Sequence, residues 1–512
     1  MENKKEIKIL TEEVWYGGIV DEGLRFPLTA QDSWQADLTI NNTTNQITTV
    51  FMSNQGRVIG SENGFKITFE HGTINITKSK TNINLVTSNE KTLQGAYRLA
   101  METYFPFTNK NIPIEMYQNA QFNTWIQLLY NQNEFDVIQY ARDILDNGYE
   151  PGVLMIDDGW SCYYGLWDFD KKKIPNPRKM IDDLHEMGFS VMLWVCPHIT
   201  PDTMEFRELA KKNLLVRSQD GTIAIREWWN GYSAILDLSN PESSEWIKKS
   251  LNTLMNRYGI DGFKFDAGDA RFYKDTDLTF GNVDANTQSH LWAELGSQFK
   301  FNELRAAVNN GGQRIVQRLA DKDHSWEDKG IKGLIPNQMI QSLFGYPFSC
   351  PDMIGGGEYE NFISNYEVLD QELFVRYAQI SSLMPMMQFS AAPWKFLDKE
   401  HSFECLNAAR LHLDFYNDLK VAFRKAEVTG EPITKPLEYV FPNQNLWKVT
   451  QQYMLGDTIL IAPIYQKGCT EHTIILPKGI WQYIGGEKYK GGRDIKIVAG
   501  INTLPIFKLI ET

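Results

Sequence analysis

Cysteine is scarce in this sequence, and its arrangement gives no sign of a covalent or metal-bound framework. The 512-residue chain has five cysteines, an odd number, and no two of them form a Cys-x-x-Cys pair. We therefore expect neither a disulfide scaffold nor a zinc site, and a reducing compartment, the cytoplasm, is the expected location. The widely spaced cysteines are Cys162, Cys196, Cys350, Cys405 and Cys469.

Long hydrophobic runs and an excess of positive charge are also missing. No stretch of about 18 apolar residues could span a membrane, and the N-terminal MENKKEIKIL is not followed by the apolar segment of a signal peptide. The chain has 51 basic and 64 acidic residues, a net charge of −13. Because an acidic surface repels nucleic acids and anionic membranes, we expect neither as a partner. A neutral small molecule fits better, and a homo-oligomer is compatible with the sequence.

The glycine pattern of a dinucleotide-binding fold is absent as well. No Gly-x-Gly-x-x-Gly joins a strand to a helix, and the run Gly355–Gly357 is interpreted as a flexible loop rather than a phosphate-binding turn. Aromatic residues are abundant by contrast, at 12% of the chain with 14 tryptophans. Aromatic faces can stack on the apolar faces of sugars, although most tryptophans in a large protein belong to its core.

The pattern of apolar and polar residues changes twice along the chain. Residues 1–112 contain short alternating runs such as FKITFEHGTINITKSKTNINLV, which are typical of an antiparallel β-sandwich. Residues 113–425 alternate between apolar strands and helix-period segments, and residues 426–512 return to short strands. The sequence therefore predicts a large central α/β domain between two β domains.

Three consecutive units show the alternation in the central domain. Residues 133–148, 176–188 and 241–259 are predicted helices, each closed by a glycine and followed by a buried strand: VLMIDD, SVMLWV and GFKFDAGD. The first helix is expected to turn Phe135 and Ile138 toward the core. Such alternation implies parallel strands, arranged either as a doubly wound open sheet or as a closed (β/α)8 barrel.

Polar side chains follow the predicted strands at their C-terminal ends. In a parallel barrel these ends converge on the active site, so the carboxylates there would face one cavity. A single aspartate after a strand can instead cap the next helix, but five strand ends carry such groups. Buried carboxylates need hydrogen-bond donors, and sugar hydroxyls are suitable ones. The groups are Asp157 and Asp158; Trp194 and His198; Lys264, Asp266 and Asp269; Asp321 and Asp323; and Asp352.

Several of these segments resemble glycoside hydrolase family 31. GIDGFKFDAGD (259–269) resembles the nucleophile segment of that family, and RLADKDHSW (318–326) resembles its acid/base segment. SLFGYPFSCPDMIGG, WWNGYSAILDLSNP and the C-terminal YMLGDTILIAPI resemble further family motifs in the same order. The resemblance runs from about residue 115 to the end of the chain. It implies a (β/α)8 TIM barrel flanked by an N-terminal β-sandwich and a C-terminal β domain.

The resemblance also assigns roles to individual residues. Asp266 would be the nucleophile and Asp321 the general acid/base, with Asp323 as a local rival that has the less suitable spacing from Trp326. Arg305, sixteen residues before Asp321, would bind substrate near the acid. The implied chemistry is the retaining route through a covalent glycosyl-enzyme intermediate, which needs neither a metal nor a cofactor. Further substrate contacts are expected from Asp157, Asp158, Trp160, Trp194, Trp229, Lys264 and Asp352.

Two features favour galactose over glucose as the bound sugar. The Arg-Asn-His run of many family 31 glucosidases is replaced here by Gln388, Phe389 and Ser390. The segments IDDGW and KFD resemble α-galactosidases of families 27 and 36, in which adjacent aspartates bind the O4 and O6 hydroxyls. We therefore expect a member of an α-galactosidase-like subgroup of family 31. The alternatives are an α-N-acetylgalactosaminidase, an α-glucosidase, a transglycosylase and a catalytically silent carbohydrate-binding protein.

Overall fold

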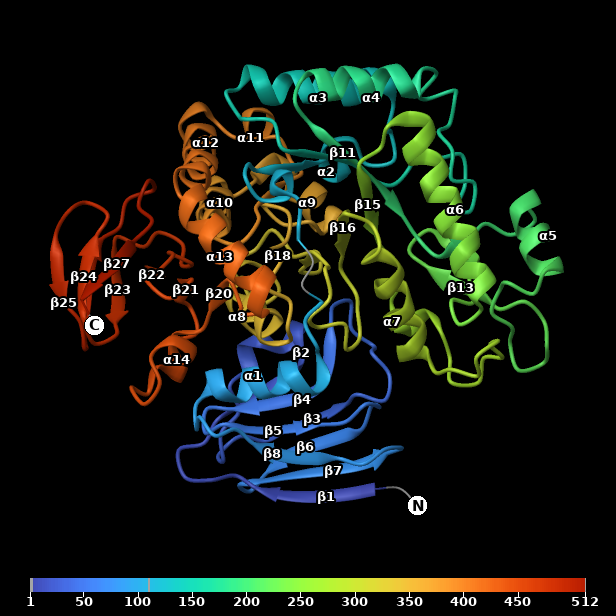
Figure 1. Ribbon diagram of the computed structural model, residues 1–512. Coiled ribbons are helices and arrows are strands. Elements are labelled where there is room, and N and C mark those ends of the chain that lie inside the picture. Colours follow the sequence, from blue (N-terminus) through green and yellow to red (C-terminus); the bar gives the residue numbers. More distant parts are fainter. Residues whose placement is uncertain (1–2, 109–110, 512) are drawn as a thin grey trace.

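The computed structural model describes residues 3–108 and 111–511, and Figure 1 shows three parts in chain order. An N-terminal β domain lies at the bottom of the view, a barrel with its helices fills the centre, and a C-terminal β domain lies at the left. This is the expected (β/α)8 barrel with flanking β domains.

The N-terminal domain is a sandwich of two antiparallel four-stranded sheets. Trp34 of one sheet packs against Phe51 of the other, with ring centroids 6.1 Å apart, so the two sheets meet face to face. Helix α1 (Leu93–Tyr104) follows the last strand, and the Thr92 hydroxyl caps it by accepting from the Gly95 amide. The sheets have the orders β1-β7-β6-β3 and β2-β4-β5-β8. The strands are β1 (Asn3–Lys8), β2 (Trp15–Ile19), β3 (Trp34–Asp37), β4 (Ile47–Ser53), β5 (Arg57–Gly60), β6 (Lys66–Glu70), β7 (Thr73–Ser79) and β8 (Asn84–Thr87).

Eight parallel strands form the barrel in the order β18-β17-β16-β15-β11-β10-β9-β19. A parallel bridge between Ile354, just after β18, and Phe389 of β19 brings the two ends of this sheet together. The barrel is therefore nearly closed rather than an open doubly wound sheet. Its strands are β9 (Gln121–Asn123), β10 (Val153–Ile156), β11 (Ser190–Val195), β15 (Gly262–Phe265), β16 (Phe301–Leu304), β17 (Gln317–Arg318), β18 (Ser349–Cys350) and β19 (Gln388–Phe389).

Helices surround the barrel, as Figure 1 shows. The predicted helix at 133–148 is α3 (Glu134–Asp146), capped by the Asn133 side chain. The prediction that Phe135 faces the core is wrong, because this side chain is 73% exposed and Val137 is buried instead. The next two predicted helices are α4 (Pro177–Glu186) and α6 (Pro241–Tyr258), the latter ended by Gly259 at φ 82°. The longer of the remaining helices are α7 (Ala285–Gly296), α8 (Ile331–Leu343), α10 (Gln371–Ser382), α12 (Lys399–Asp414) and α13 (Tyr416–Thr429), and the shorter ones are α2 (Trp125–Leu128), α5 (Met204–Lys211), α9 (Tyr359–Ser364), α11 (Pro393–Phe396) and α14 (Leu437–Val440).

A small antiparallel sheet is inserted between β11 and α6. Its order is β12-β14-β13, with β12 (His198–Ile199), β13 (Ile225–Trp228) and β14 (Gly231–Ile235). The short turn between β13 and β14 consists of Trp229 and Asn230. The insertion carries this turn to the C-terminal ends of the barrel strands, where both side chains take part in the candidate site.

The C-terminal β domain has its own apolar core around Trp481 and Phe507. Arg376 of α10 is buried and donates to the carbonyls of Gly500 and Thr503, which joins this domain to the barrel. One sheet has the order β20-β21-β22-β27-β24-β25, and a second pairs β23 with β26. The strands are β20 (Thr434–Lys435), β21 (Tyr453–Leu455), β22 (Ile459–Ile461), β23 (Glu471–Leu476), β24 (Ile480–Tyr483), β25 (Lys488–Lys490), β26 (Arg493–Val498) and β27 (Ile506–Glu511).

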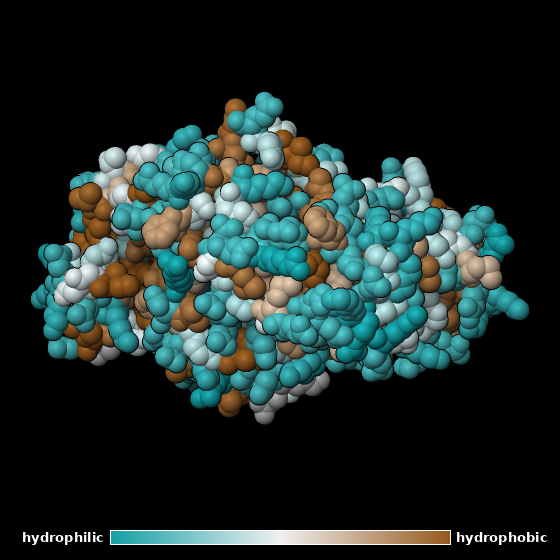
Figure 2. Space-filling model, turned by 90° about the horizontal axis from the view of Figure 1, so that it is seen from above, coloured by the Kyte–Doolittle hydropathy of each residue, from teal (hydrophilic) through white to brown (hydrophobic). Residues whose placement is uncertain are grey.

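The outer surface is mostly polar on the side seen in Figure 2, where apolar side chains gather only in small separate groups. Among the helices of residues 3–108 and 111–511, none is both long and apolar enough to cross a membrane. All five cysteines are free thiols.

Candidate active site

A cavity of about 440 Å³ opens at the C-terminal ends of the barrel strands. This volume lies within the range of small-molecule sites. Eight of the ten predicted site residues line it: Asp157, Asp158, Trp194, Trp229, Lys264, Asp266, Arg305 and Asp321. The cavity is completed by Thr44, Trp125, Tyr130, Arg271, Ala320, Glu358, Tyr359 and Glu360.

Asp266 follows β15 and is held on both carboxyl oxygens. Its Oδ1 accepts from Arg305 Nε and Nη2 at 3.1 and 3.0 Å, and its Oδ2 accepts from Trp194 Nε1 at 3.0 Å. Burial alone would raise the pKa of Asp266, but the positive charges of Arg305, Lys264 and Arg318 outweigh burial and lower the pKa below its usual range. Asp266 is thus an oriented, ionised carboxylate at neutral pH, as a nucleophile must be.

Arg305 is fixed by a second carboxylate and by the N-terminal domain. Its Nη1 and Nη2 donate to the two oxygens of Asp269 at 3.1 and 2.8 Å, and Asp269 is fully buried. Nη1 also donates to the backbone carbonyl of Thr44, from the loop before β4. Asp269 therefore orients the arginine that binds Asp266.

Asp321 follows β17 and reaches the cavity, whereas Asp323 does not line it. The Asp321 side chain is 38% exposed and accepts from Arg318 Nη1 at 2.8 Å. A partly exposed carboxyl group on the cavity wall can meet the leaving oxygen of a substrate. Of the two rivals in the DKD segment, the position of Asp321 is the one that fits an acid/base.

Asp157 and Asp158 end β10 in different electrostatic surroundings. Asp157 forms an ion pair with Lys264, Oδ2 to Nζ at 2.7 Å, and this charge raises the pKa of Lys264 although burial opposes it. Asp158 accepts instead from neutral donors, Tyr164 Oη at 3.0 Å and Asn230 Nδ2 at 2.7 Å. Burial, followed by the charge of Asp157, raises the pKa of Asp158 to about 7.

Because the pKa of Asp158 is raised in the folded protein, this carboxyl group is expected to lower the free energy of unfolding by an amount that depends on pH. Below about pH 4 the carboxyl is protonated in both the folded and the unfolded chain and contributes nothing. Between about pH 4 and 7 only the unfolded chain ionises, so stability falls as the pH rises, and above about pH 7 the full cost remains. We expect Asp158→Asn to raise the free energy of unfolding by on the order of 2–4 kcal/mol at pH 8 and by little at pH 4.

Urea denaturation of both proteins at the two pH values measures this difference. Asp275→Asn is the matched control, because Asp275 is exposed and lies outside the cavity. An Asp158→Asn protein that is no more stable than the wild type at pH 8 would contradict the predicted cost.

Aromatic side chains form much of the wall and mouth of the cavity. Trp194 donates to Asp266, and Trp229 is 44% exposed at the mouth with the Arg305 guanidinium 5.8 Å from its ring centroid. Trp125 lies edge-on to Tyr359, with ring centroids 5.4 Å apart. An open site with such faces suits the apolar faces of a sugar.

Trp160 does not line the cavity. It is 1% exposed, its Nε1 donates to the backbone carbonyl of Trp194 at 2.8 Å, and its ring packs against Trp167 and Phe169. Trp160 therefore supports the strand that carries Trp194 and does not reach the cavity as a sugar contact would. Asp352 is also fully buried behind the cavity wall, where Arg318 and two backbone amides donate to it. His198 likewise stays behind the wall, stacked on Trp228 with ring centroids 4.1 Å apart.

The residues in place of the family's Arg-Asn-His run point into the protein. Gln388 donates to Gln121 Oε1 at 3.0 Å and Glu303 Oε2 at 2.8 Å inside the barrel. The Ser390 hydroxyl accepts from the backbone amide of Ile126 at 2.7 Å. Neither side chain lines the cavity, so this strand end contributes no group that would bind a sugar.

Some cavity residues were not foreseen in the sequence. Thr44 comes from the N-terminal sandwich, and no local pattern connects it with Arg305, 261 residues further along the chain. Glu358 and Glu360 follow the glycine run, and carboxylates after such a turn could have been recognised as candidates. Among residues 3–108 and 111–511, no group of three or more His, Cys, Asp or Glu side chains could hold a metal ion.

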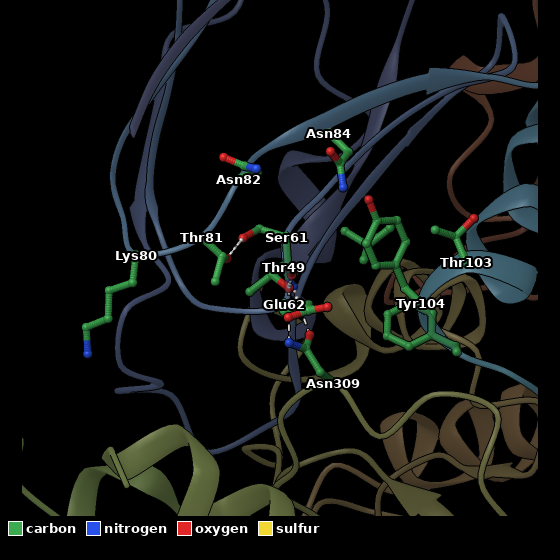
Figure 3. Close-up of a pocket in the computed structure, with 12 residues that line it drawn as sticks. Thr49, Ser61, Glu62, Lys80, Thr81, Asn82, Asn84, Thr103, Tyr104 and Asn309 are labelled. Atoms are coloured by element: carbon green, nitrogen blue, oxygen red, sulfur yellow. Dashed lines mark hydrogen bonds between the residues drawn. The ribbon is translucent and has the colours of Figure 1, made fainter. Parts of the chain in front are cut away.

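A second cavity, of about 800 Å³, is lined by the N-terminal sandwich, the end of α1 and Asn309 of the barrel domain, and is shown in Figure 3. Its labelled side chains are mostly hydroxyls and amides, and Glu62 is the only carboxylate that lines it. A double displacement at a sugar needs two carboxyl groups. The larger cavity therefore does not provide the chemistry that the barrel cavity provides.

Comparisons with known proteins agree with this geometry. The model of the glycosyl hydrolases family 31 TIM-barrel domain matches residues 114–412, and that of the family 31 C-terminal domain matches residues 430–508. Myogenesis-regulating glycosidase of Mus musculus is 31% identical over 409 residues, which cover 77% of this chain and 56% of the relative. Alpha-glucosidase 2 of Bacillus thermoamyloliquefaciens is 24% identical, and the match covers 73% of this chain and 50% of that relative. The chain thus spans about half the length of these relatives.

A solved structure supports the same fold. The cycloalternan-degrading enzyme from Trueperella pyogenes, in complex with a covalent intermediate, matches with a TM-score of 0.82 and 18% identity. The match covers 99% of this chain and 78% of that one.

Proposed function

Because the chain belongs to glycoside hydrolase family 31, we propose that it is a retaining, exo-acting α-glycosidase that releases terminal α-linked galactose. The observation that carries the proposal is that Asp266 and Asp321 line one cavity with different partners. Asp266 is bound by Arg305 and kept ionised, whereas Asp321 is partly exposed at the wall.

The proposed reaction has two displacements. Asp266 attacks the anomeric carbon while Asp321 gives its proton to the leaving oxygen as the glycosidic bond breaks. Water then attacks the glycosyl-enzyme, gives a proton to Asp321 and releases the sugar with its configuration retained. The structural relative from Trueperella pyogenes, which is described with a covalent intermediate, supports this route by analogy of fold.

The shape of the cavity supports removal of a terminal sugar. Asp157 and Lys264 are almost fully buried at its inner end, with side chains 3% and 5% exposed. Trp229 and Glu360 lie at exposed positions of its lining. A sugar that enters far enough to meet Asp157 would leave only its anomeric side open, so we expect a chain end rather than an internal residue to bind.

The inner end also supports galactose as the sugar. Asp157 and Asp158 are neighbouring hydrogen-bond groups, one charged and one able to keep a proton near neutral pH. Together with Lys264 they could bind the axial O4 and the O6 of galactose. The histidine that many family 31 glucosidases use is absent, and Gln388 and Ser390 do not replace it in the cavity. A small carbohydrate or glycoconjugate is accordingly the proposed partner.

A panel of 4-nitrophenyl α-glycosides tests the assignment of the sugar. We expect kcat/KM for the α-galactoside to exceed that for the α-glucoside by roughly 10²- to 10⁴-fold, because a buried polar group that loses its partner is costly. The α-N-acetylgalactosaminide is included, since it shares the axial O4. Rapid turnover of the glucoside alone, as the similarity to Alpha-glucosidase 2 would suggest, would contradict the proposed specificity. Binding without hydrolysis would favour a silent carbohydrate-binding protein.

A further inference from the structure

Three carboxylates surround one buried arginine behind the proposed acid/base. Arg318, at the end of β17, is 1% exposed. Its Nη1 donates to Asp321 Oδ1 at 2.8 Å and to Asp352 Oδ1 at 2.6 Å, and its Nε lies 3.3 Å from Glu303 Oε1. One positive charge is therefore divided among three acids, and a carboxylate that gains or loses a proton changes the share that the others receive.

Asp352 is the carboxylate that competes most directly with Asp321 for Arg318, because both accept from the same nitrogen. Its other oxygen accepts from the backbone amides of Lys322 and Gly357 at 2.7 and 2.8 Å. The side chain is fully buried and does not line the cavity. Burial raises the pKa of Asp352 to about 7, and the charge of Asp321 adds to this while Arg318 opposes it.

Gly357 shows how close the two acids are. A Cβ atom placed on this glycine would lie 2.7 Å from Asp352 Oδ1 and 3.0 Å from Asp321 Oδ1. The run Gly355–Gly357, interpreted from the sequence as a flexible loop, is instead buried. At Gly356, with φ 99°, a Cβ atom would lie 2.6 Å from the Lys322 carbonyl. The glycines let the backbone pass over the acid pair without filling the space between them.

Other ionisable groups face the pair from the neighbouring strands, loops and helices. All of them would remain in place when Asp352 alone is changed, so a single substitution isolates its contribution. They are Lys264, Asp266, Glu303, Arg305, Lys322, Asp323, Cys350, Glu358 and Tyr377.

We propose that Asp352 is a positioning residue that controls the proton on Asp321 by sharing the charge of Arg318. This inference rests on the proposed function. While Asp352 is ionised it takes part of the positive charge of Arg318, so less of that charge opposes a proton on Asp321, the group that the proposed reaction uses as the acid. Asp352 itself forms and breaks no covalent bond, and the proton that Asp321 loses in the first step returns from water in the second.

Replacing Asp352 by asparagine tests this role. The amide keeps the size of the side chain and an oxygen for the backbone amides, but it returns the charge of Arg318 to Asp321. We expect the alkaline limb of the kcat/KM profile to move to lower pH by about one unit or more, which lowers the rate on a poor leaving group about tenfold at pH 7.5. A 2,4-dinitrophenyl glycoside, whose leaving group needs no proton, should lose less than about threefold.

Asp275→Asn is the control, because it removes one carboxylate charge at an exposed position outside the cavity and should leave the profile in place. If Asp352→Asn does not fold, Glu303→Gln serves as the second variant, because Glu303 faces the same guanidinium. For Glu303→Gln we expect the alkaline limb of the kcat/KM profile to move to lower pH by a smaller amount. Melting temperatures establish that each variant is folded.

The outcomes separate this inference from the proposed function. If the wild type hydrolyses no α-glycoside, the proposed function fails and the inference fails with it. If the wild type is active and Asp352→Asn loses equal activity on both leaving groups with no shift of the profile, Asp352 is merely structural and only the inference is overturned.

Discussion

Asp266→Ala is expected to lower kcat by about 10⁴-fold or more on every α-glycoside that the wild type hydrolyses, because the variant lacks the carboxylate that is proposed to attack the anomeric carbon. Asp266 lies in the cavity, is bonded to Arg305 and Trp194, and has a pKa held below its usual range. The loss should fall on kcat for good and poor leaving groups alike, since both need the nucleophile.

Added azide gives this prediction a chemical signature. A small anion can occupy the space left by the carboxylate and attack the sugar directly, so the product should be the β-glycosyl azide, with inverted configuration. Asp323→Asn, which leaves the cavity lining intact, is the control and should behave like the wild type. Unchanged hydrolysis by Asp266→Ala would remove the proposed nucleophile.

Asp321→Ala is expected to show the complementary pattern. Loss of a general acid costs about 10²- to 10⁴-fold for a leaving group that needs a proton, and much less in the first step for 2,4-dinitrophenolate. With the activated substrate the glycosyl-enzyme should accumulate, because no base remains to activate water. Burst kinetics followed by a slow steady state would report this accumulation.

Azide should accelerate the Asp321→Ala protein through the second step. It attacks the glycosyl-enzyme without needing a base, so the product should be the α-glycosyl azide, of opposite configuration to the product of Asp266→Ala. The same azide isomer from both variants would contradict the two assigned roles.

Much of the fold could be predicted from the sequence because local signals and long-range packing agree. Helices α3 and α6 begin within one residue of their predicted starts, Gly259 ends α6 with a positive φ, and the buried strands carry polar groups at one end. Once the strands are parallel, those ends share one side of the barrel. The prediction for Phe135 was wrong because helical period gives the width of an apolar face only approximately.

The candidate site could be predicted in composition but not in detail. Trp160 and Trp229 each belong to a family-like sequence motif. Trp160 is nevertheless buried and Trp229 is 44% exposed, because loop conformation decides where each ring points. Thr44 reaches Arg305 from another domain, and such a contact leaves no local signal. The cluster around Arg318 draws its acids from three neighbouring strand ends, so strand order had to be known before it could be recognised.

The most direct test of the central claim is to identify the residue that becomes covalently attached to the sugar. A 5-fluoro-α-galactosyl fluoride should form a glycosyl-enzyme quickly and release it slowly, because the fluorine destabilises the positively charged transition states. Peptide mass spectrometry of the inactivated protein should then find one added sugar on Asp266 and none on the Asp266→Ala protein. A sugar attached to Asp321 or to another residue, or rapid turnover of the reagent to the inverted product, would contradict the account.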